Sequence, residues 1–548
     1  MNLNQPISRR GALWGVGSSL WLAAAGCSRR ELAAIEGGFT GTSPERGHVL
    51  REVRRQREPD VTRRAHTVIA GGGIAGLAAA RALRQRGHDD FALLELEDAP
   101  GGNSRGTQVG GIACPQGAHY LPVPGDDARE VQDLLEELGL RRRVAGRWVL
   151  DERHLCHSPQ ERLYFEGHWQ EGLLPMQGVG AGTLAQYRRF AALVADAQRQ
   201  AHYAIPVFRS TFAPAQQALD AITFKAWLDQ HGLTDAHLRW YLDYACRDDF
   251  GAGIATVSAW AGLHYFASRH GFHAPGDGDG EADAVFTWPE GNGWLSSQLA
   301  APLGDRLHTG RVVLRIAHER EGVVVDALDV AANRLERWHA RQAVVALPLR
   351  VAARVVQPLP DALRQHAASL RSAPWLVANL RLRAPLQDRR GAAPSWDNVL
   401  YGSTGLGYVD ATHQSLRPVP GPTVLTWYRA MGDEPAARQA LLDTPWASWR
   451  DAVIAELAPA HPDLASKTLR IDITRYGHAM AVPVPGVLSQ IGRWRPMDGR
   501  NQLLKKEHLA LPHFPEAPRL AFAHSDWAGY SIFEEAFTLG HAAGLVLS

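Results

Sequence analysis

Apolar and polar positions divide the chain into segments of recognisable kinds. The apolar run Val68-Ile69-Ala70 leads into glycines and an alanine-rich stretch ending at Leu83, which predicts a buried strand, a turn and a helix. The stretch FALLELE at 91–97 predicts a second strand. Helical periodicity appears in three later stretches, 131–140, 183–200 and 222–233. Two others alternate as half-buried strands do, 375–383 and 422–430.

The clearest loop is HAPGDGDGEADA, at 273–284. Its acidic residues lack the spacing of a calcium-binding EF-hand, so we interpret it as a solvated loop.

Composition narrows the possible partners. The chain has 548 residues, long enough for roughly three folding units. Its 58 Lys and Arg residues nearly balance 57 Asp and Glu residues. A net charge of +1 leaves no basic excess to neutralise phosphates, so we expect no nucleic-acid partner. The four cysteines show neither a disulfide framework nor metal-ligand spacing, and we expect no metal: Cys27, Cys114, Cys156 and Cys246.

The first 27 residues form an export signal in our interpretation. Arg9-Arg10 precedes an uncharged run from Gly11 to Gly26, which is short for a membrane span. The pattern resembles a twin-arginine signal, and the Ala-Ala-Gly-Cys ending at Cys27 resembles a lipoprotein cleavage site. These features predict a periplasmic or cell-envelope protein held at the membrane surface by a lipid on Cys27. The polar stretch 28–63 is predicted to be a tether.

A dinucleotide-binding turn follows the first strand. Gly71, Gly73 and Gly76 form G-x-G-x-x-G, in which the glycines permit a tight turn, close approach of a pyrophosphate and close packing of helix on strand. Glu95 stands 22 residues beyond Gly73, near the end of the second strand. A carboxylate there accepts hydrogen bonds from the adenosine ribose.

The residues after this unit resemble the flavin monoamine oxidase and phytoene desaturase superfamily. Gly101-Gly102 match glycines that approach the FAD phosphates there. The family usually has Arg directly after this pair; here Asn103 takes that place, and the phosphate role passes to Arg105. The resemblance implies FAD as the cofactor. It also implies an α/β fold, with a Rossmann-like FAD-binding domain assembled from discontinuous segments and an interleaved α+β substrate domain.

Two later motifs extend the resemblance. Val313, in the returning strand after GNGWLSSQL, matches the residue whose main chain meets the adenine. Asp526 matches the acid that binds the ribityl–pyrophosphate part of FAD, although His524-Ser525 replaces the family's Ala-Gly. Mapped on this chain, the FAD-binding domain comprises 64–130, 285–352 and 515–548, and the substrate domain comprises 131–284 and 353–514.

The catalytic residues of amine-oxidising relatives are not matched. Their lysine, which holds a water against the flavin, corresponds to Asn379, which is a candidate to hold that water in its place. An aromatic-cage tyrosine of these relatives corresponds to Ala479. His478 is a candidate acid–base group or flavin attachment point, and His119, in GAHYL, is a similar candidate. Glu534 and Glu535 could attract a cationic substrate or could favour a helix N-terminus.

Three interpretations follow. The first is an exported FAD-dependent oxidoreductase that dehydrogenates a small organic substrate, such as an amine or polyamine, and passes electrons to an unidentified acceptor. The second is a redox-neutral flavin isomerase or mutase, which the missing lysine permits. The third is a non-catalytic flavin-binding assembly protein. Fold resemblance alone does not choose among them.

Overall fold

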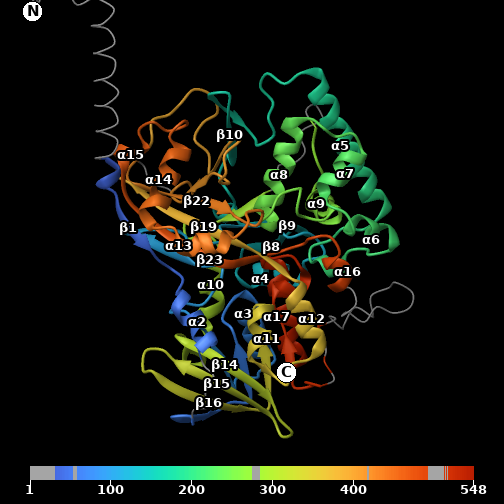
Figure 1. Cartoon of the computed structure of the whole chain (residues 1–548), viewed down its shortest axis with the longest axis vertical. Coiled ribbons are helices and arrows are strands. Elements are labelled where there is room, and N and C mark those ends of the chain that lie inside the picture. The colour runs from blue at the N-terminus through green and yellow to red at the C-terminus, as the bar shows by residue number, and fades with distance from the viewer. Residues whose placement is uncertain are drawn as a thin grey trace, which may run out of the picture.

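The computed structural model describes residues 31–52, 58–274, 284–415, 419–491, 511–512, 514 and 516–547. Two sheet-based parts lie one above the other in Figure 1. The lower part contains a parallel sheet and a mixed sheet, and the upper part contains an eight-stranded sheet flanked by helices.

The parallel sheet carries the predicted dinucleotide unit. Its strands, in spatial order, are β13 (Leu307–His308), β4 (Phe91–Leu94), β3 (Thr67–Ala70), β17 (Gln342–Val345) and β24 (Leu520–Phe522). Every residue of β3 and β4 is buried, as expected of parallel strands covered on both faces. The two strands predicted from the apolar runs are therefore confirmed.

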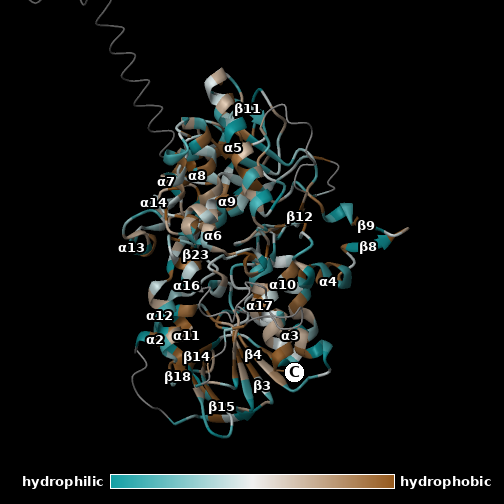
Figure 2. Ribbon diagram, turned by 90° about the vertical axis from the view of Figure 1, so that its right-hand side faces the viewer, coloured by the Kyte–Doolittle hydropathy of each residue, from teal (hydrophilic) through white to brown (hydrophobic). Residues whose placement is uncertain are grey.

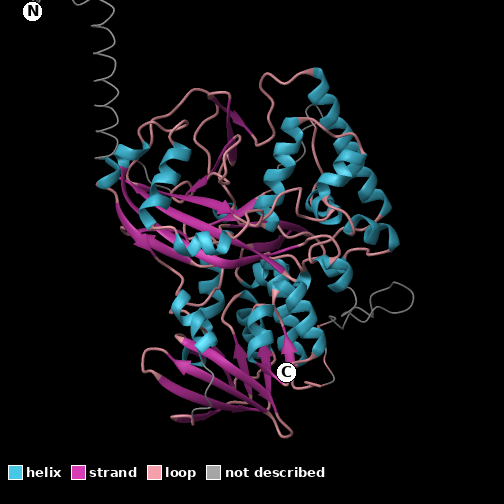
Figure 3. Ribbon diagram, in the orientation of Figure 1, coloured by secondary structure: helices cyan, strands magenta, loops and turns pink. Residues whose placement is uncertain are grey.

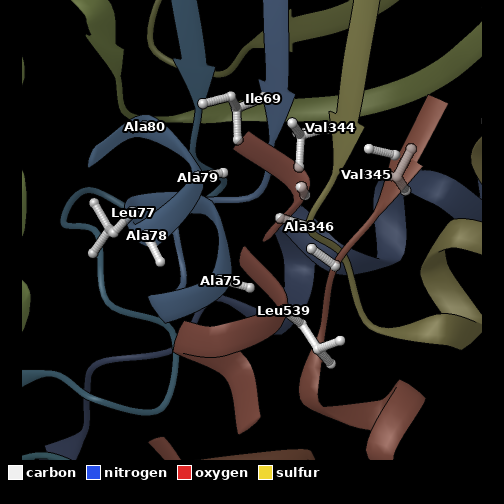
Figure 4. Packing of buried hydrophobic residues seen from close by; sticks show 14 of the residues in the cluster. Ile69, Ala75, Leu77, Ala78, Ala79, Ala80, Val344, Val345, Ala346 and Leu539 are labelled. Atoms are coloured by element: carbon white, nitrogen blue, oxygen red, sulfur yellow. The ribbon is translucent and has the colours of Figure 1, made fainter. Parts of the chain in front are cut away.

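Two helices cover this sheet at close range. Helix α3 (Ile74–Gln85) begins at the glycine turn and packs against α17 (Phe533–Val546). A Cβ on Gly540 would lie 2.0 Å from the carbonyl oxygen of Ala75, so only glycine permits this approach. Figure 4 shows the alanines of α3 packed against the sheet and Leu539.

A mixed sheet packs beside the parallel one, with antiparallel pairing among its three central strands and parallel pairing at both edges. Its order is β18 (Val356–Gln357), β14 (Arg311–His318), β15 (Val323–Asp329), β16 (Arg334–Ala340) and β2 (Val61–Arg64). Within β14 the register shifts between Val313 and Arg315, next to the predicted adenine contact.

The eight-stranded sheet of the upper part separates two groups of helices, a larger one and a smaller one (Figure 3). Its order is β1 (Glu36–Phe39), β23 (Thr468–Val482), β19 (Arg371–Leu382), β22 (Thr423–Ala430), β21 (Tyr408–Asp410), β20 (Asp397–Leu400), β10 (Glu161–Phe165) and β11 (His168–Glu171). The predicted strands at 375–383 and 422–430 are confirmed as β19 and β22.

Alternate residues of β19 face the two layers. Leu376, Ala378 and Leu380 pack with one set of helices, α13 (Ala437–Asp443), α14 (Trp446–Leu457) and α15 (Leu464–Lys467). Trp375 and Val377 face the other set, α5 (Ala181–Gln200), α6 (Pro214–Asp220), α7 (Phe224–Gln230), α8 (Ala236–Phe250) and α9 (Ala259–Ala267). This two-residue period is the physical basis of the alternation in the sequence.

The predicted helices are present, and the cores show where each belongs. The three periodic stretches form α4 (Arg129–Glu137), α5 and α7. Helix α4 packs in the core of the parallel sheet, as do α11 (Leu349–Val355) and α12 (Asp361–Ser369). These three helices share one hydrophobic core with the segments predicted to bind FAD, and the domain boundaries drawn from the sequence stay a prediction.

Smaller elements complete the described chain. They are α10 (Gly293–Ala300), α16 (Val487–Ile491), the paired strands β5 (Gly106–Val109) and β6 (Ile112–Pro115), β7 (Tyr120–Pro122) and β12 (Val285–Thr287), and β8 (Arg141–Val144) and β9 (Arg147–Leu150). Short 3₁₀ helices span Glu152–His154, Val207–Arg209, Ala301–Arg306 and Ser525–Ala528.

The segment predicted as a tether is built into the molecule where it is described. Strand β1 pairs in parallel with β23, and helix α2 (Pro44–Glu52) lies beside β14. Arg46 forms an ion pair with Asp98 at 2.9 Å, and the backbone N–H of Ser43 donates to Glu97. The polar composition of 41–52 reflects these ion pairs and hydrogen bonds, so the tether prediction is corrected for this segment.

Several expectations lie outside the described residues. These are the export signal, Cys27 and most of the loop at 273–284. Among the residues described, no helix is both long and apolar enough to span a membrane. In the same residues, no group of three or more His, Cys, Asp or Glu side chains is placed to hold a metal ion.

Candidate active site

A cavity of about 440 Å³ runs from the glycine turn of the lower part to the helices of the upper part. Its walls come from segments far apart in the sequence, including the turn after β3, the end of β4, strand β14, strands β19 and β23, helix α8 and the start of α17. The cavity therefore forms only when both large sheets have assembled.

The glycine turn presents backbone to one end of the cavity. Gly71 and Gly73 line it, together with Gly101 and Gly102 from the following loop. Helix α3 begins here with no side-chain cap, so its first N–H groups are free to meet an anion. Gly76 lies outside the lining and serves packing, because a Cβ there would lie 1.9 Å from the carbonyl oxygen of Gly71.

Glu95 stands at the end of β4, beside this turn. Its carboxylate accepts the backbone N–H groups of Gly72 and Glu97, each at 2.8 Å. Burial raises the pKa of Glu95, although both N–H groups and Arg105 oppose that effect. The carboxylate is thus held in a fixed orientation against the cavity, as a ribose-binding acid requires.

The residues at this end fit a flavin nucleotide. Four glycines, Gly71, Gly73, Gly101 and Gly102, line the cavity without side chains, and the Glu95 carboxylate lies beside them. Asn292 is buried in the same wall and donates through its amide to the carbonyl of Tyr120 at 2.9 Å. Its Oδ1 has no hydrogen-bond partner among the described residues but is itself buried away from the open cavity.

Two predicted cofactor residues hold loops in place from outside the lining. Arg105 Nε donates to the carbonyl of Gly102 at 3.0 Å, and Asp526 accepts the backbone N–H of Leu349 at 2.9 Å. Burial acts to raise the pKa of Asp526, but His524 and the Leu349 N–H outweigh it and the pKa is lowered. From the turn of Asp526, His524 and Ser525 line the cavity.

Val313 lines the cavity together with Arg311 and Val312 of the same strand. These residues and the glycine turn line the same cavity. The position predicted to meet the adenine and the backbone predicted to meet the phosphates therefore face one space. Their roles in binding FAD remain predictions.

The two candidate histidines reach the cavity, but both are poor bases. Burial lowers the pKa of His119 to about 3, and its ring stacks on Tyr428 with centroids 4.5 Å apart. Burial, together with Arg438 and Arg350, lowers the pKa of His478 to about 4. Both rings are therefore neutral at pH 7, and neither readily accepts a proton there.

Asn379 lies outside the cavity lining, contrary to a role beside the flavin. Its amide donates to the carbonyl of Pro115 at 3.0 Å, and its Oδ1 accepts from Thr426 at 2.7 Å. Trp375 and Val377, on the same face of β19, reach the cavity instead. Both ends of the Asn379 side-chain amide are therefore used in hydrogen bonds that link β19 to β22 and β6.

The upper end of the cavity is acidic, which the sequence signalled only in part. Asp248 and Asp249 near the end of α8 and Glu534 at the start of α17 line it, with Arg269 as the neighbouring cation. Glu534 was singled out from the sequence. The adjacent aspartates were not, because nothing in the periodicity of α8 shows that this end of the helix faces a cavity.

Arg269 is engaged by its own surroundings. It donates to Asp249 at 3.2 Å, to the Tyr530 hydroxyl at 2.9 Å and to the Tyr265 carbonyl at 2.8 Å. Tyr530 also hydrogen-bonds Asp249. Arg269 thus neutralises the carboxylate of Asp249, and two other carboxylates of the cavity lining remain.

Asp248 and Glu534 are those two carboxylates. Burial raises the pKa of Asp248 to about 7, with Asp249 adding to the effect. Burial likewise raises the pKa of Glu534 to about 7, and its side chain is only 3% exposed. Both acids thus titrate near neutrality inside the cavity, where they attract a cation in their ionised form.

Three solved structures share this fold across most of the chain. A putrescine oxidase bound to putrescine aligns with a TM-score of 0.64 and 19% identity, covering 88% of this chain and 99% of that one. Cyclohexylamine oxidase from Brevibacterium oxydans aligns with a TM-score of 0.60 and 19% identity, covering 88% and 98%. A fatty acid isomerase from P. acnes gives 0.55 and 16%, covering 90% and 99%. The predicted α/β fold class is confirmed.

Sequence relatives point to the same group of flavoproteins. An L-amino acid dehydrogenase from Synechocystis sp. is 26% identical over 311 residues, which is 55% of this chain and 59% of that protein. Putrescine oxidase from Kocuria rosea is 28% identical over 171 residues, or 31% and 32%. The chain thus spans less than two thirds of either relative. The sequence pattern described as flavin containing amine oxidoreductase matches residues 74–543, which is most of the chain. The chain belongs to the flavin-containing amine oxidoreductase family.

Proposed function

We propose that this protein binds FAD and dehydrogenates a small cationic amine, such as a diamine or polyamine, by hydride transfer to the flavin. Family membership supports flavin-dependent oxidation of an amine or amino acid. One observation carries the choice of substrate: the end of the cavity remote from the glycine turn holds three carboxylates against a single arginine.

The cofactor would occupy the cavity from the glycine turn towards Asn292. The N-terminus of α3 and the backbone of Gly71, Gly73, Gly101 and Gly102 would meet the pyrophosphate. Glu95 would bind the ribose. When bound, FAD supplies the hydride acceptor.

The acidic end favours an amine over an amino acid. Arg269 is held by Asp249, Tyr530 and the Tyr265 carbonyl, so it has no free edge reserved for a substrate carboxylate. Asp248 and Glu534 repel such a carboxylate and attract ammonium groups. Two carboxylates, each without a basic side-chain partner within ion-pair distance in the described chain, suit a substrate with two cationic nitrogens.

These acids are also better placed than the histidines to receive a proton from the substrate. An amine must lose its ammonium proton before its carbon donates a hydride. A group with a pKa near the working pH is the most effective general base, and Asp248 and Glu534 meet that condition. We therefore assign proton acceptance to Asp248 and Glu534. His119 and Tyr428 instead pack together as part of the cavity wall.

We also propose that the chain is exported by the twin-arginine route and anchored at the membrane surface through a lipid on Cys27. Arg9-Arg10, the uncharged run and the Ala-Ala-Gly-Cys sequence support this proposal. Export in the folded state suits a protein whose cofactor cavity is assembled from both sheets.

The test uses purified full-length protein with its flavin content recorded by absorption. Anaerobic titration with putrescine, butylamine and leucine should bleach the flavin most effectively with putrescine. Replacing Glu534→Gln or Asp248→Asn should weaken putrescine binding at least tenfold, because each removes a buried charge. Asp361→Asn, at an exposed acid, is the matched control.

The same preparation distinguishes the alternatives. Leucine as the preferred reductant would overturn the amine assignment, and a flavin that no amine reduces would favour the isomerase or assembly interpretation. Flavin retained after acid precipitation, and lost in His478→Ala, would make His478 its attachment point. An intact-mass measurement reads the processing at Cys27, and an unmodified N-terminus would contradict lipidation.

A further inference from the structure

Strands β8 and β9 form a hairpin that stands away from the rest of the molecule. Among the described residues they pair with each other and with no third strand, and they follow α4 in the chain. Figure 2 shows the hairpin projecting at the right-hand side with its turn at the far end.

The hairpin combines exposed apolar and basic side chains. Of the seven large hydrophobic side chains exposed in the described residues, three lie here: Val144, Trp148 and Val149, at 45%, 42% and 38%. The sequence RRRVAGRWVL from 141 to 150 contains four arginines and no acid.

Register distributes both kinds of residue over the two faces. One face pairs Arg142 with Val149 and Val144 with Arg147. On the other face Arg143 lies opposite Trp148. The guanidinium carbon of Arg141 lies 3.7 Å from the centroid of the Trp148 ring. Each face therefore presents arginine beside an apolar side chain. The hairpin packs on the protein at its base, through Leu150 and the 11% exposed Arg141 side chain, whereas residues 142–149 are exposed.

Nearby acids neutralise one of the four arginines. Glu136 forms an ion pair with Arg141 at 3.5 Å, whereas Asp151 pairs with Arg153, outside the hairpin, at 2.6 Å. Arg142, Arg143 and Arg147 have no acidic partner within ion-pair distance in the part of the chain that the structure describes.

We propose that this hairpin binds the surface of an anionic lipid bilayer, with Trp148 and the valines in the interfacial region and the arginines on lipid phosphates. Tryptophan prefers the membrane interface, and arginine extends its charge to headgroups while its stem stays in apolar surroundings. Basic residues near an anionic surface add affinity individually.

A lipid surface fits better than an acidic protein. A stable protein interface needs about 800 Å² on each side with a flat, well-packed centre. A ten-residue hairpin exposed on both faces offers a thin projection instead, which suits insertion between headgroups. The proposal rests on the hairpin alone and is independent of Cys27 and of the flavin chemistry.

The test is cosedimentation of the full chain with vesicles of phosphatidylcholine, with and without about 30 mol% phosphatidylglycerol. The wild type should bind the anionic vesicles more tightly and lose this advantage as salt is raised. The variant Arg142→Gln/Arg143→Gln/Arg147→Gln should bind them about 100-fold more weakly, from about fivefold per arginine. Trp148→Ser should also weaken binding.

The control is Arg320→Gln/Arg341→Gln/Arg364→Gln, which makes the same charge change at scattered exposed positions. It should bind like the wild type, and all proteins should retain equal flavin content. Any affinity of the N-terminal run is common to every variant and cancels in the comparison. Equal binding by the hairpin triple and the control would overturn the proposal. So would wild-type binding that ignores anionic lipid, which would leave an acidic protein as the occupant to test.

Discussion

The glycines of the nucleotide turn meet different demands at the scale of single residues. Gly71 has φ +103°, and a Cβ there would lie 2.3 Å from the carbonyl oxygen of Ala346. Gly76 is fixed by contact with Gly71. Gly73 has φ −70°, and the atom nearest to an added Cβ, Gly102 Cα, lies 3.9 Å away. The fold therefore requires two of these glycines, whereas the third keeps space open for a ligand.

Gly73→Ala should consequently fold normally and lose flavin. The added methyl projects where the cavity backbone would approach a pyrophosphate, so we expect flavin occupancy to fall at least tenfold while the apoprotein's melting temperature stays within about 2 °C of wild-type apoprotein. Flavin absorbance per protein and thermal melting measure the two effects. Gly47→Ala, where an added Cβ meets no atom within 4 Å, is the control. Full flavin retention in Gly73→Ala would contradict the proposed cradle.

Sequence reasoning located the strand–turn–helix unit of β3 and α3 correctly because backbone geometry dictates residue type there. Glycines and a strand-end acid occupy fixed positions in a local strand–turn–helix unit, and Glu95 lies where that unit requires it. Asn379 shows the opposite case. Its position on an alternating strand identifies the correct face, but the covering carbonyl of Pro115 comes from 264 residues away. Such a contact has no signature in either local sequence.

At the scale of elements, strand β1 shows why polar composition was a poor guide. Residues 36–39 pair with 470–473 through backbone hydrogen bonds, which leave no hydrophobic pattern in a four-residue strand. One residue of the strand is nevertheless tightly constrained. Gly37 has φ +142°, and a Cβ there would lie 1.8 Å from the carbonyl oxygen of Ile471.

Gly37→Ala should therefore detach β1, whereas Gly38→Ala should not. The neighbouring glycine has no atom within 4 Å of an added Cβ, which makes the pair a matched comparison. We expect Gly37→Ala to cost about 2 kcal/mol locally and to expose residues 31–52 to protease. Limited proteolysis with mass mapping measures this exposure. Identical digestion of both variants would show that β1 pairing contributes little, as a true tether would.

At the scale of the whole molecule, buried carboxylates extend from the cavity into the second sheet. Glu161 and Asp397 occupy paired positions on the parallel strands β10 and β20. Burial raises the pKa of Glu161 to about 7, and burial with Glu161 and Asp248 raises the pKa of Asp397. The upper part of the molecule thus concentrates acidic groups for which the structure describes few basic partners. The proposed attraction of a cationic amine and a cost in stability would have the same physical origin.

That cost has a definite pH dependence. An ordinary glutamate in the unfolded chain has a pKa of about 4.3, whereas Glu161 in the native protein has a pKa of about 7. Between these values the native state retains a proton that the unfolded state has lost. The contribution of protonated Glu161 to the free energy of unfolding is therefore complete below about pH 4.3. It disappears as the pH rises through about 7, because native Glu161 then ionises in its buried site.

Glu161→Gln removes this titration, so relative to wild type the variant should gain about 1–2 kcal/mol in unfolding free energy between pH 5 and pH 8. Denaturant unfolding of flavin-loaded protein at several pH values measures this gain, and Glu319→Gln, at an exposed acid, should show no such trend. If the curves of wild type and Glu161→Gln stay parallel, the pKa of Glu161 is the same in the native and unfolded states, and the predicted cost of this acid is absent.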